Sequence, residues 1–294
     1  MDAMSGPDVV LATGRRMPIP DPESHLLVAA LRDLGFVATV QPWGSGYEWS
    51  AAPLVVVRTP WDYFEAREPF LEWARGVAAV TSLINPFEVV EWNSHKGYLL
   101  DLRRAGVPVV ETTVVVRGAS IDAQAAALRA HVGEVVVKPA VGGGATGAVR
   151  GEADGATARR QLAELVRSGD ALVQPLAVTV TTQGEISLVY FGGEFSHAVR
   201  KVPAAGDYRV QAEHGGQVEP HDPSSSERAV GAAALARTPR PTAYGRVDLV
   251  DVGGTPTVME LEVIEPQLFL DRHPDAARRF ADQLARELRA AKCQ

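Results

Sequence analysis

The 294-residue sequence contains a single cysteine, Cys293, and this scarcity excludes two classes of protein. One cysteine cannot build an intramolecular disulfide framework, and no cysteine cluster is available to bind zinc. No apolar run reaches the roughly 18 residues of a membrane-spanning helix, and the first residues do not follow a signal-peptide pattern. We therefore expect a cytoplasmic protein without a membrane partner.

Positive charge is also scarce. The sequence has 29 Lys and Arg residues against 36 Asp and Glu residues, a formal net charge of −7. No run of basic residues alternates with aromatic ones, so we expect no nucleic-acid partner. The lysines number only four: Lys96, Lys138, Lys201 and Lys292. A chain that prefers arginine has little structural use for lysine, so a lysine within an ordered segment is a candidate functional residue. Lys292, near the end of the chain, is expected to be solvated.

The first part of the chain predicts a small α/β unit. Strands are predicted over 9–12, 36–41 and 54–58, and a helix over 21–34. Alternating strands and helices indicate a parallel sheet, and ligands of such sheets bind at the carboxyl ends of the strands. A polar and aromatic segment follows the third strand at such an end. Its candidate substrate residues are Arg58, Trp61, Asp62 and Tyr63; the alternative is a turn around a buried tryptophan.

Further elements are predicted along the rest of the chain. A helix is expected over 92–105, with Lys96 in its first turns, where a positive charge requires an anionic partner. Other expected elements are strands over 114–116 and 171–175, helices from 121 and over 156–168, hairpins over 184–201 and 244–263, a long lid-like loop over 203–220, and a final helix from Pro274.

The segment 134–149 indicates phosphate binding. A run of β-branched residues precedes Lys138, and a glycine-rich loop follows shortly after this lysine. Glycines let backbone N–H groups approach an anion closely, and the lysine adds a charge beside them. The loop leads into a second strand, which fits neither a dinucleotide-binding nor a Walker A pattern but resembles loops that cover ATP phosphates. A plain glycine hairpin is the alternative. The candidate loop residues are Gly142, Gly143, Gly144, Thr146 and Gly147.

Three carboxylates on the last predicted hairpin indicate a metal site. Glu260 and Glu262 face the same side of their strand, and the hairpin brings Asp248 beside them. Three acids on an apolar hairpin repel one another unless a cation lies between them. Oxygen ligands favour Mg²⁺, with Mn²⁺ as a possible substitute. A solvated hairpin face is the alternative, which the surrounding apolar residues disfavour.

Several other residues are candidates for nucleotide and phosphate contacts. Gln174 and Leu176 end a buried strand and are expected to bind a base edge, while Glu185 is expected to bind ribose hydroxyls. Lys201 and Arg209 flank the predicted lid and are expected to clamp phosphates. The seven histidines are scattered, most of them expected at the surface or at caps, although His95 and His214 lie near the predicted site. The sequence has no nucleophile-elbow motif and no zinc-protease motif.

Taken in order, these features resemble the ATP-grasp superfamily. Within it, the chain is similar to the glutathione synthetase branch and most of all to the O-ureidoserine cyclo-ligases of cycloserine biosynthesis. The segments that carry this likeness are VVRTPWDY at 56–63, NPFEVVEWNSHK at 85–96, RVD at 246–248 and MELEVIEPQLF at 259–269. Two positions depart from the pattern: His95 stands where an acid is expected and Gln267 where a serine is expected, and the second affects substrate identity.

The resemblance implies an α/β (α+β) fold of three subdomains, over 1–92, 93–173 and 174–294, with ATP between the last two. It implies that Lys96 and Lys138 hold phosphates, that Asp248, Glu260 and Glu262 bind Mg²⁺, and that Arg58, Lys201 and Arg209 act in catalysis. A carboxylate of an amino-acid-like substrate would form an acyl phosphate, which a nitrogen of the same molecule would attack to close a ring. Two alternatives remain: a two-substrate ligase and a nucleotide-binding regulatory protein without turnover. The relatives also imply a homodimer.

Overall fold

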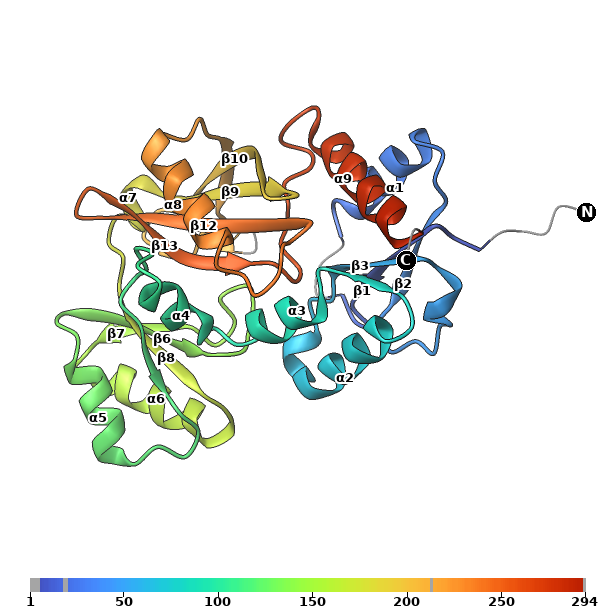
Figure 1. The fold of residues 1–294 in the computed structure, drawn as a ribbon. Helices are drawn as coiled ribbons and strands as arrows, with labels where there is room; N and C mark the ends of the chain where they lie inside the picture. The colour runs from blue at the N-terminus through green and yellow to red at the C-terminus, as the bar shows by residue number, and fades with distance from the viewer. Residues whose placement is uncertain (1–5, 18–20, 212–213, 293–294) are drawn as a thin grey trace, which may run out of the picture.

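The computed structural model describes residues 6–17, 21–211 and 214–292, which form three sheets with helices packed on them (Figure 1). The first sheet has the order β2-β1-β3-β4, and all of its pairs are parallel, as predicted. Its strands are β1 (Val9–Thr13), β2 (Ala38–Pro42), β3 (Leu54–Thr59) and β4 (Ser82–Ile84).

Helices cover both faces of this sheet because its central strands are apolar on both sides. Val9 and Leu11 pack with α1 (Ser24–Asp33) and α9 (Ala276–Ala291), whereas Val10 packs with α2 (Arg67–Ala78) on the opposite face. Phe280, Leu284 and Leu288 of α9 are buried, which confirms the predicted apolar face of this helix. The chain thus returns at its end to the first sheet, where α9 lies beside α1 (Figure 1).

The second sheet has the order β5-β8-β6-β7 and is antiparallel. Its strands are β5 (Thr113–Val115), β6 (Glu134–Pro139), β7 (Val149–Glu152) and β8 (Ala171–Pro175). The helices α5 (Ile121–Arg129) and α6 (Ala156–Ser168) bury one face of it. The strands predicted on either side of the glycine loop, β6 and β7, pair with each other in this sheet.

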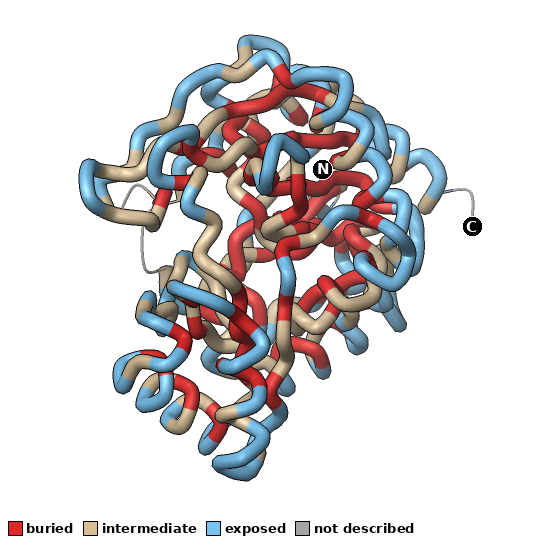
Figure 2. The backbone as a smooth tube through the Cα atoms, turned by 90° about the vertical axis from the view of Figure 1, so that its left-hand side faces the viewer, coloured by how far each residue is buried: buried red, intermediate tan, exposed pale blue. Residues whose placement is uncertain are grey.

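The third sheet has the order β11-β10-β9-β12-β13. Its strands are β9 (Glu185–Phe191), β10 (Glu194–Val202), β11 (Gln217–Pro220), β12 (Tyr244–Val252) and β13 (Thr255–Glu262). Both predicted hairpins are confirmed. The buried face packs with α4 (Tyr98–Arg104) and α8 (Ser225–Leu235), so it contacts the chain segment that leads into the second sheet. Buried residues gather in the interior of the molecule and exposed residues lie on its outside (Figure 2).

The structure corrects three sequence predictions. The helix expected over 92–105 is two helices, α3 (Phe87–Asn93) and α4, and Lys96 lies in the break between them. The loop expected over 203–220 ends in strand β11, which pairs with β10. The prediction also missed α2, β4 and α8, although Ser224 and Glu227 form a capping box that marks the start of α8. The short 3₁₀ turns η1 (Trp49–Ala51) and η2 (Tyr63–Glu65) and the one-turn helix α7 (Val180–Gln183) complete the described elements.

Candidate active site

The three predicted carboxylates lie together at the paired ends of β12 and β13. In the register of this hairpin, Asp248 pairs with Glu260 and Arg246 pairs with Glu262. Ser187 of β9 pairs with Asp248 from the other side, and its hydroxyl donates to Asp248 Oδ1 at 2.6 Å. The expected proximity of the acids is therefore confirmed at the level of strand register.

Two lysines from different parts of the chain converge on one of these acids. Lys138 Nζ and Lys96 Nζ each lie 3.0 Å from Glu260 Oε1. The backbone N–H of Lys96 donates to Ala140 O at 2.8 Å, which ties the α3–α4 break to the end of β6. Burial raises the pKa of Glu260, but the two lysines outweigh this effect and hold it well below its usual range. Glu260 is thus an anion shared by two cations.

A second charged cluster surrounds Asp248. Arg246 donates to both of its carboxylate oxygens at 2.9 Å, and Lys201 Nζ lies 3.1 Å from Oδ2. Burial opposes ionisation of Asp248, yet these two cations lower its pKa to about 2. Lys201 also pairs with Glu185, whose pKa burial nevertheless raises to about 7. Arg246 reaches Glu262 as well, at 2.5 Å.

This arrangement changes the argument for a metal. The cations between the carboxylates are the chain's own lysines and Arg246, so the apolar hairpin does not by itself require a metal ion. Among the residues that the structure describes, no set of three acid, histidine or cysteine side chains is arranged as a ready metal site. The donors of Asp248, Glu260 and Glu262 are all oxygens, which is the chemistry that Mg²⁺ prefers.

The glycine loop bridges β6 and β7 beside Lys138. Gly144 and Gly147 have φ values of 58° and 72°, in the left-handed region that glycine tolerates best. Ala145 shares this conformation with φ of 57°, so a residue with a side chain is held in a costly conformation there. The loop is tied from outside, because Gln161 donates to Gly147 O at 2.7 Å and Tyr208 donates to Ala148 O at 3.3 Å. Gly142, Gly143 and Thr146 belong to the same loop.

The other nucleotide candidates already have partners within the chain. Gln174 is buried and donates to Thr112 Oγ1 at 2.9 Å, and the Leu176 N–H donates to Glu134 O at 2.9 Å. Arg209 binds Asp207, with Nη2 and Oδ2 2.8 Å apart, and this hydrogen bonding lowers the pKa of the Asp207 carboxyl. The contacts of Gln174, Leu176 and Arg209 with nucleotide or phosphate remain predictions.

Two substrate candidates occupy positions that the sequence did not reveal. Arg58 has no exposed surface and pairs with Glu23, with Nη2 and Oε2 3.2 Å apart, so its guanidinium is not an open fork. Asp62 is buried and accepts hydrogen bonds from Trp43 Nε1 at 2.7 Å and from the Arg15 and Arg16 N–H groups at 3.0 Å each. Both side chains hold the carboxyl ends of the first sheet in place, because partners distant in sequence surround them.

The remaining candidates surround a segment that follows β13. Trp61 Nε1 donates to Glu265 O at 3.0 Å, and Arg246 donates to Gln267 O at 3.0 Å. Tyr63 is buried next to this region. His95, one of the two departures from the family pattern, lies 3.3 Å from Asp170 through Nε2. Of the remaining histidines, His131 and His197 are buried rather than at the surface.

The structure also contains functional candidates that sequence reasoning missed. Glu23 was read only as part of a helix start, and Glu265 only as part of a family motif. No spacing rule links either to its neighbours in space, because Arg58 lies 35 residues from Glu23 and Trp61 lies 204 residues from Glu265. Only the capping pattern near Glu23 was visible in the sequence.

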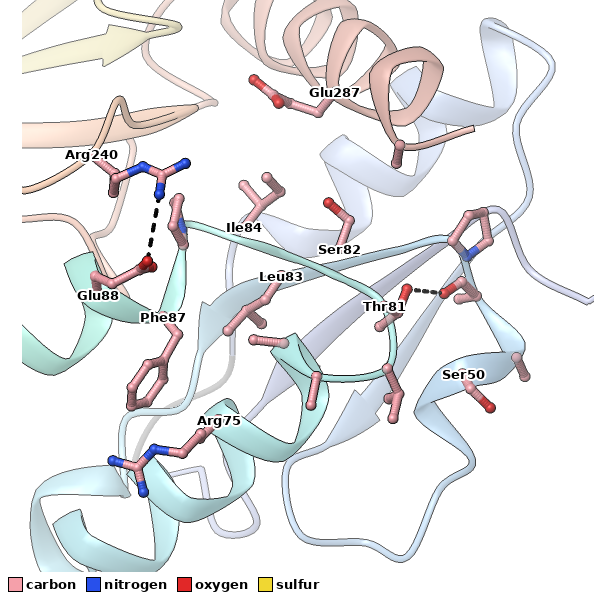
Figure 3. A pocket seen from close by; sticks show the side chains of 18 residues that line it. Ser50, Arg75, Thr81, Ser82, Leu83, Ile84, Phe87, Glu88, Arg240 and Glu287 are labelled. Atoms are coloured by element: carbon pink, nitrogen blue, oxygen red, sulfur yellow. Dashed lines mark hydrogen bonds and ion pairs between the residues drawn. The ribbon is translucent and has the colours of Figure 1, made fainter. Parts of the chain in front are cut away.

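A large groove elsewhere contains none of the predicted site residues. It measures about 950 Å³ and is lined by the edge strand β4 with parts of α2, α3 and α9 (Figure 3). Arg75, Arg240, Glu88 and Glu287 border it, and Arg240 pairs with Glu88 at 3.5 Å. The groove and the cluster of predicted charged residues therefore lie in different parts of the structure. Within the described part of the chain, no helix is long and apolar enough to cross a membrane.

Comparisons with known proteins agree on one family. Residues 9–85 match the family model of the D-cycloserine synthetase DcsG N-terminal domain. The chain is 38% identical over 279 residues to the cycloserine biosynthesis protein DcsG of Streptomyces lavendulae, covering 90% of this chain and 93% of that protein.

Solved structures show the same relationship. The crystal structure of D-cycloserine synthetase DcsG is 35% identical, with a TM-score of 0.87 over 95% of this chain and 99% of that one. A structure of the ATP-grasp ligase PsnB in complex with a phosphomimetic precursor variant, Mg and ADP is 18% identical. Its TM-score is 0.66 over 96% of this chain and 99% of that one, so the likeness to PsnB concerns the fold alone.

Proposed function

The chain belongs to the DcsG family of ATP-grasp carbon–nitrogen ligases, and from this premise we propose that it activates a carboxylate of a small amino-acid-like substrate with ATP in cycloserine-type biosynthesis. One observation carries the proposal: Lys96 and Lys138 meet at Glu260, beside Asp248 and Glu262. The ammonium groups of Lys96 and Lys138 neutralise Glu260 in this structure. If Glu260 binds a metal ion instead, both ammonium groups become available to bind phosphate.

The residues have distinct roles in this proposal. Lys96, Lys138 and the N–H groups of the glycine loop bind phosphates, with the base near Gln174 and Leu176 and the ribose near Glu185. Asp248, Glu260 and Glu262 are the oxygen donors for Mg²⁺, or for Mn²⁺ in its place. Mg²⁺ held by these three acids would neutralise the negative charge that develops on the phosphate groups. Lys201 and Arg209 stabilise the transferred phosphoryl group.

The reaction proceeds in two steps. A substrate carboxylate oxygen attacks the γ-phosphorus of ATP, the bond to the β-phosphate oxygen breaks, and ADP leaves. A nitrogen then attacks the acyl carbon, inorganic phosphate leaves, and the nitrogen loses a proton. The glycine loop and the described parts of the predicted lid, 203–211 and 214–220, would exclude water, which would otherwise hydrolyse the acyl phosphate.

Ring closure within one molecule is the favoured form of the second step, because 90% and 95% of the chain match two relatives named for cycloserine biosynthesis. A two-substrate ligase that makes a dipeptide-like amide is the alternative. A regulatory protein without turnover is disfavoured by the intact set of lysines and acids. The subdomain boundaries at 92 and 173, ATP between the central and C-terminal parts, and a homodimer belong to the same proposal.

ADP release tests this function directly. The purified protein with Mg²⁺ and ATP should release ADP with O-ureidoserine alone, and mass spectrometry should find a cyclised product. Release only with a pair of amino acids would favour the two-substrate alternative, and no release with any carboxylate would reject ligase activity.

Glu260→Gln tests the site within that assay. It removes a charge and a metal donor but keeps the shape of the side chain, so turnover should be lost while the circular dichroism spectrum is preserved. Glu68→Gln is a matched control on an exposed side chain that pairs only with its neighbour Arg67, and it should be as active as the wild type. Full activity of Glu260→Gln at saturating Mg²⁺ would contradict the metal assignment.

A further inference from the structure

The segment from Glu265 to Leu270 is held by side chains from the first and third sheets. The carbonyls of Glu265, Pro266 and Gln267 accept hydrogen bonds from Trp61, Arg58 and Arg246. The N–H groups of Leu268 and Leu270 donate to the Glu23 carboxylate at 2.9 and 3.0 Å, and His197 lies 2.9 Å from Leu268 O. A short segment with so many specific partners has a fixed backbone.

Backbone strain confirms that this conformation is imposed. Phe269 has φ of 52°, which is unfavourable for a bulky residue. Only two non-glycine residues in the described ranges have positive φ; the other is Ala145 of the glycine loop. Such conformations persist where surrounding contacts over-determine them, and they concentrate at functional sites. The strain at Phe269 is therefore a second indication that surrounding contacts fix this segment.

Glu265 on this fixed backbone is a half-buried acid. Among the described residues, Glu265 forms no ion pair and no side-chain hydrogen bond, in contrast to Glu260, Glu262 and Asp248. On one side of the segment, Arg246 contacts Asp248 and Glu262 and also donates to Gln267 O. On the other side, Trp61 at the carboxyl end of β3 donates to Glu265 O. Glu265 thus lies between the metal-site carboxylates and the carboxyl ends of the first sheet.

We propose that Glu265 binds the α-ammonium group of the substrate amino acid, and this inference rests on the function proposed above. Asp62 is the acid among the substrate candidates named from the sequence, but its oxygens are occupied by Trp43 and two backbone N–H groups. Glu265 is a half-buried acid in this region whose side-chain oxygens accept no hydrogen bond from another of the described residues.

The chemistry gives the contact a purpose. An ion pair with a carboxylate keeps the α-nitrogen protonated, so that it cannot attack the acyl phosphate of a second substrate molecule and form a dipeptide-like amide. Burial, aided by the charge of Glu262, raises the pKa of Glu265 to about 8. A bound ammonium group would favour the ionised form and supply the missing counter-charge.

The test compares a substrate with and without the α-ammonium group. The probes are O-ureidoserine and its des-amino counterpart, 3-(carbamoylaminooxy)propanoic acid, in the ADP-release assay. Glu265→Gln should raise the KM for O-ureidoserine by roughly ten- to hundredfold, the range for loss of a charge-assisted contact. The KM for ATP should change less than about twofold, and both enzymes should use the des-amino compound equally poorly. Glu68→Gln is the matched control and should leave every value unchanged.

Several outcomes would overturn the inference. One is an unchanged KM for O-ureidoserine in Glu265→Gln, and another is an equal loss with both compounds, which would indicate a structural role. If Glu265→Gln does not fold, the wild type still decides: equal use of both compounds would refute ammonium recognition. If the wild type releases no ADP with either, the proposed function fails, and calorimetric binding of the two compounds tests Glu265 separately; equal Kd values would reject it.

Discussion

At the scale of single residues, the site is defined by how few lysines the chain keeps and where they lie. Three of the four contact carboxylates of the candidate site, since Lys96 and Lys138 pair with Glu260 and Lys201 pairs with Asp248 and Glu185. Lys292 instead forms an exposed pair with Asp8. Lys292 is therefore a suitable control position for substitutions of the other three lysines.

Lys138→Ala should weaken ATP binding. It removes a point charge at the end of β6, and loss of a charge-assisted contact corresponds to on the order of 1.5–3 kcal/mol, or roughly ten- to hundredfold in Kd. Isothermal calorimetry with a non-hydrolysable ATP analogue and Mg²⁺ measures this effect. Lys292→Ala should bind like the wild type, and an unchanged Kd for Lys138→Ala would remove Lys138 from the site.

His197 should make stability depend on pH. Its ring is buried between Ser196 Oγ and Leu268 O, each at 2.9 Å, and burial lowers its pKa to about 4 from the usual 6.5. As pH falls through 6.5, His197 takes up a proton in the unfolded chain but not in the folded one. The free energy of unfolding therefore decreases between pH 6.5 and pH 4. At pH 5 the loss is roughly 2 kcal/mol relative to pH 7.5.

Thermal unfolding of His197→Gln isolates this contribution. The variant lacks the titrating ring, so its Tm should fall less than that of the wild type between pH 7.5 and pH 5. Parallel Tm curves for the two proteins would show that His197 does not titrate in this way.

At the scale of elements, helix α8 shows how close packing restricts side-chain size. It covers the third sheet through Gly231, Ala234 and Leu235. A Cβ atom on Gly231 would overlap the Tyr190 hydroxyl and lie 2.6 Å from Leu188 Cδ1. The glycine that weakens this helix intrinsically is therefore required by the sheet beneath it.

Gly231→Ala should destabilise the protein although alanine favours helices. Overpacking of this kind costs typically 1–3 kcal/mol, more than the roughly 0.5–1 kcal/mol gained in helix propensity. The matched control is Gly76→Ala in α2, where nothing lies within 4 Å of the added Cβ, and Tm should rise slightly. Equal shifts of Tm in both variants would contradict the packing argument.

At the scale of the whole molecule, one buried ion pair joins distant parts of the chain. Glu23 before α1 pairs with Arg58 of β3, and both contact the segment Glu265–Leu270 that leads to α9. Burial raises the pKa of Glu23, and Arg58 counteracts it. The pair therefore fixes the first sheet relative to the segment that carries Glu265.

Arg58→Met should lower stability strongly, because it leaves the Glu23 charge buried without a cation. Such losses are about 3–5 kcal/mol. The double variant Glu23→Gln/Arg58→Met removes both charges of this pair and should recover part of that loss, which differential scanning calorimetry measures. A double variant less stable than Arg58→Met alone would contradict this account, and a large rise in the KM for substrate at unchanged Tm would instead support a direct substrate contact of Arg58.

Local patterns predicted much of the fold because they depend on neighbours in sequence. Runs of β-branched residues predicted the strands β1, β3, β6 and β8. Glycine pairs predicted both hairpins, and the two-residue period of a strand predicted that Glu260 and Glu262 share one face. The break at Lys96 was missed because the helical pattern continues on both sides of it; the backbone contact with Ala140 holds it there. Helix α8 was missed despite its capping box.

The sequence by itself determined the ATP-grasp family, the parallel first sheet, the glycine loop and the identity of the charged residues. Tertiary structure alone decided which charges meet. Arg58 and Asp62 became buried because Glu23 and Trp43 surround them, and the site carboxylates are neutralised by lysines from three separate segments. Secondary structure follows from short-range sterics and periodicity, whereas electrostatic partners depend on distances that arise only when segments far apart in the chain pack together.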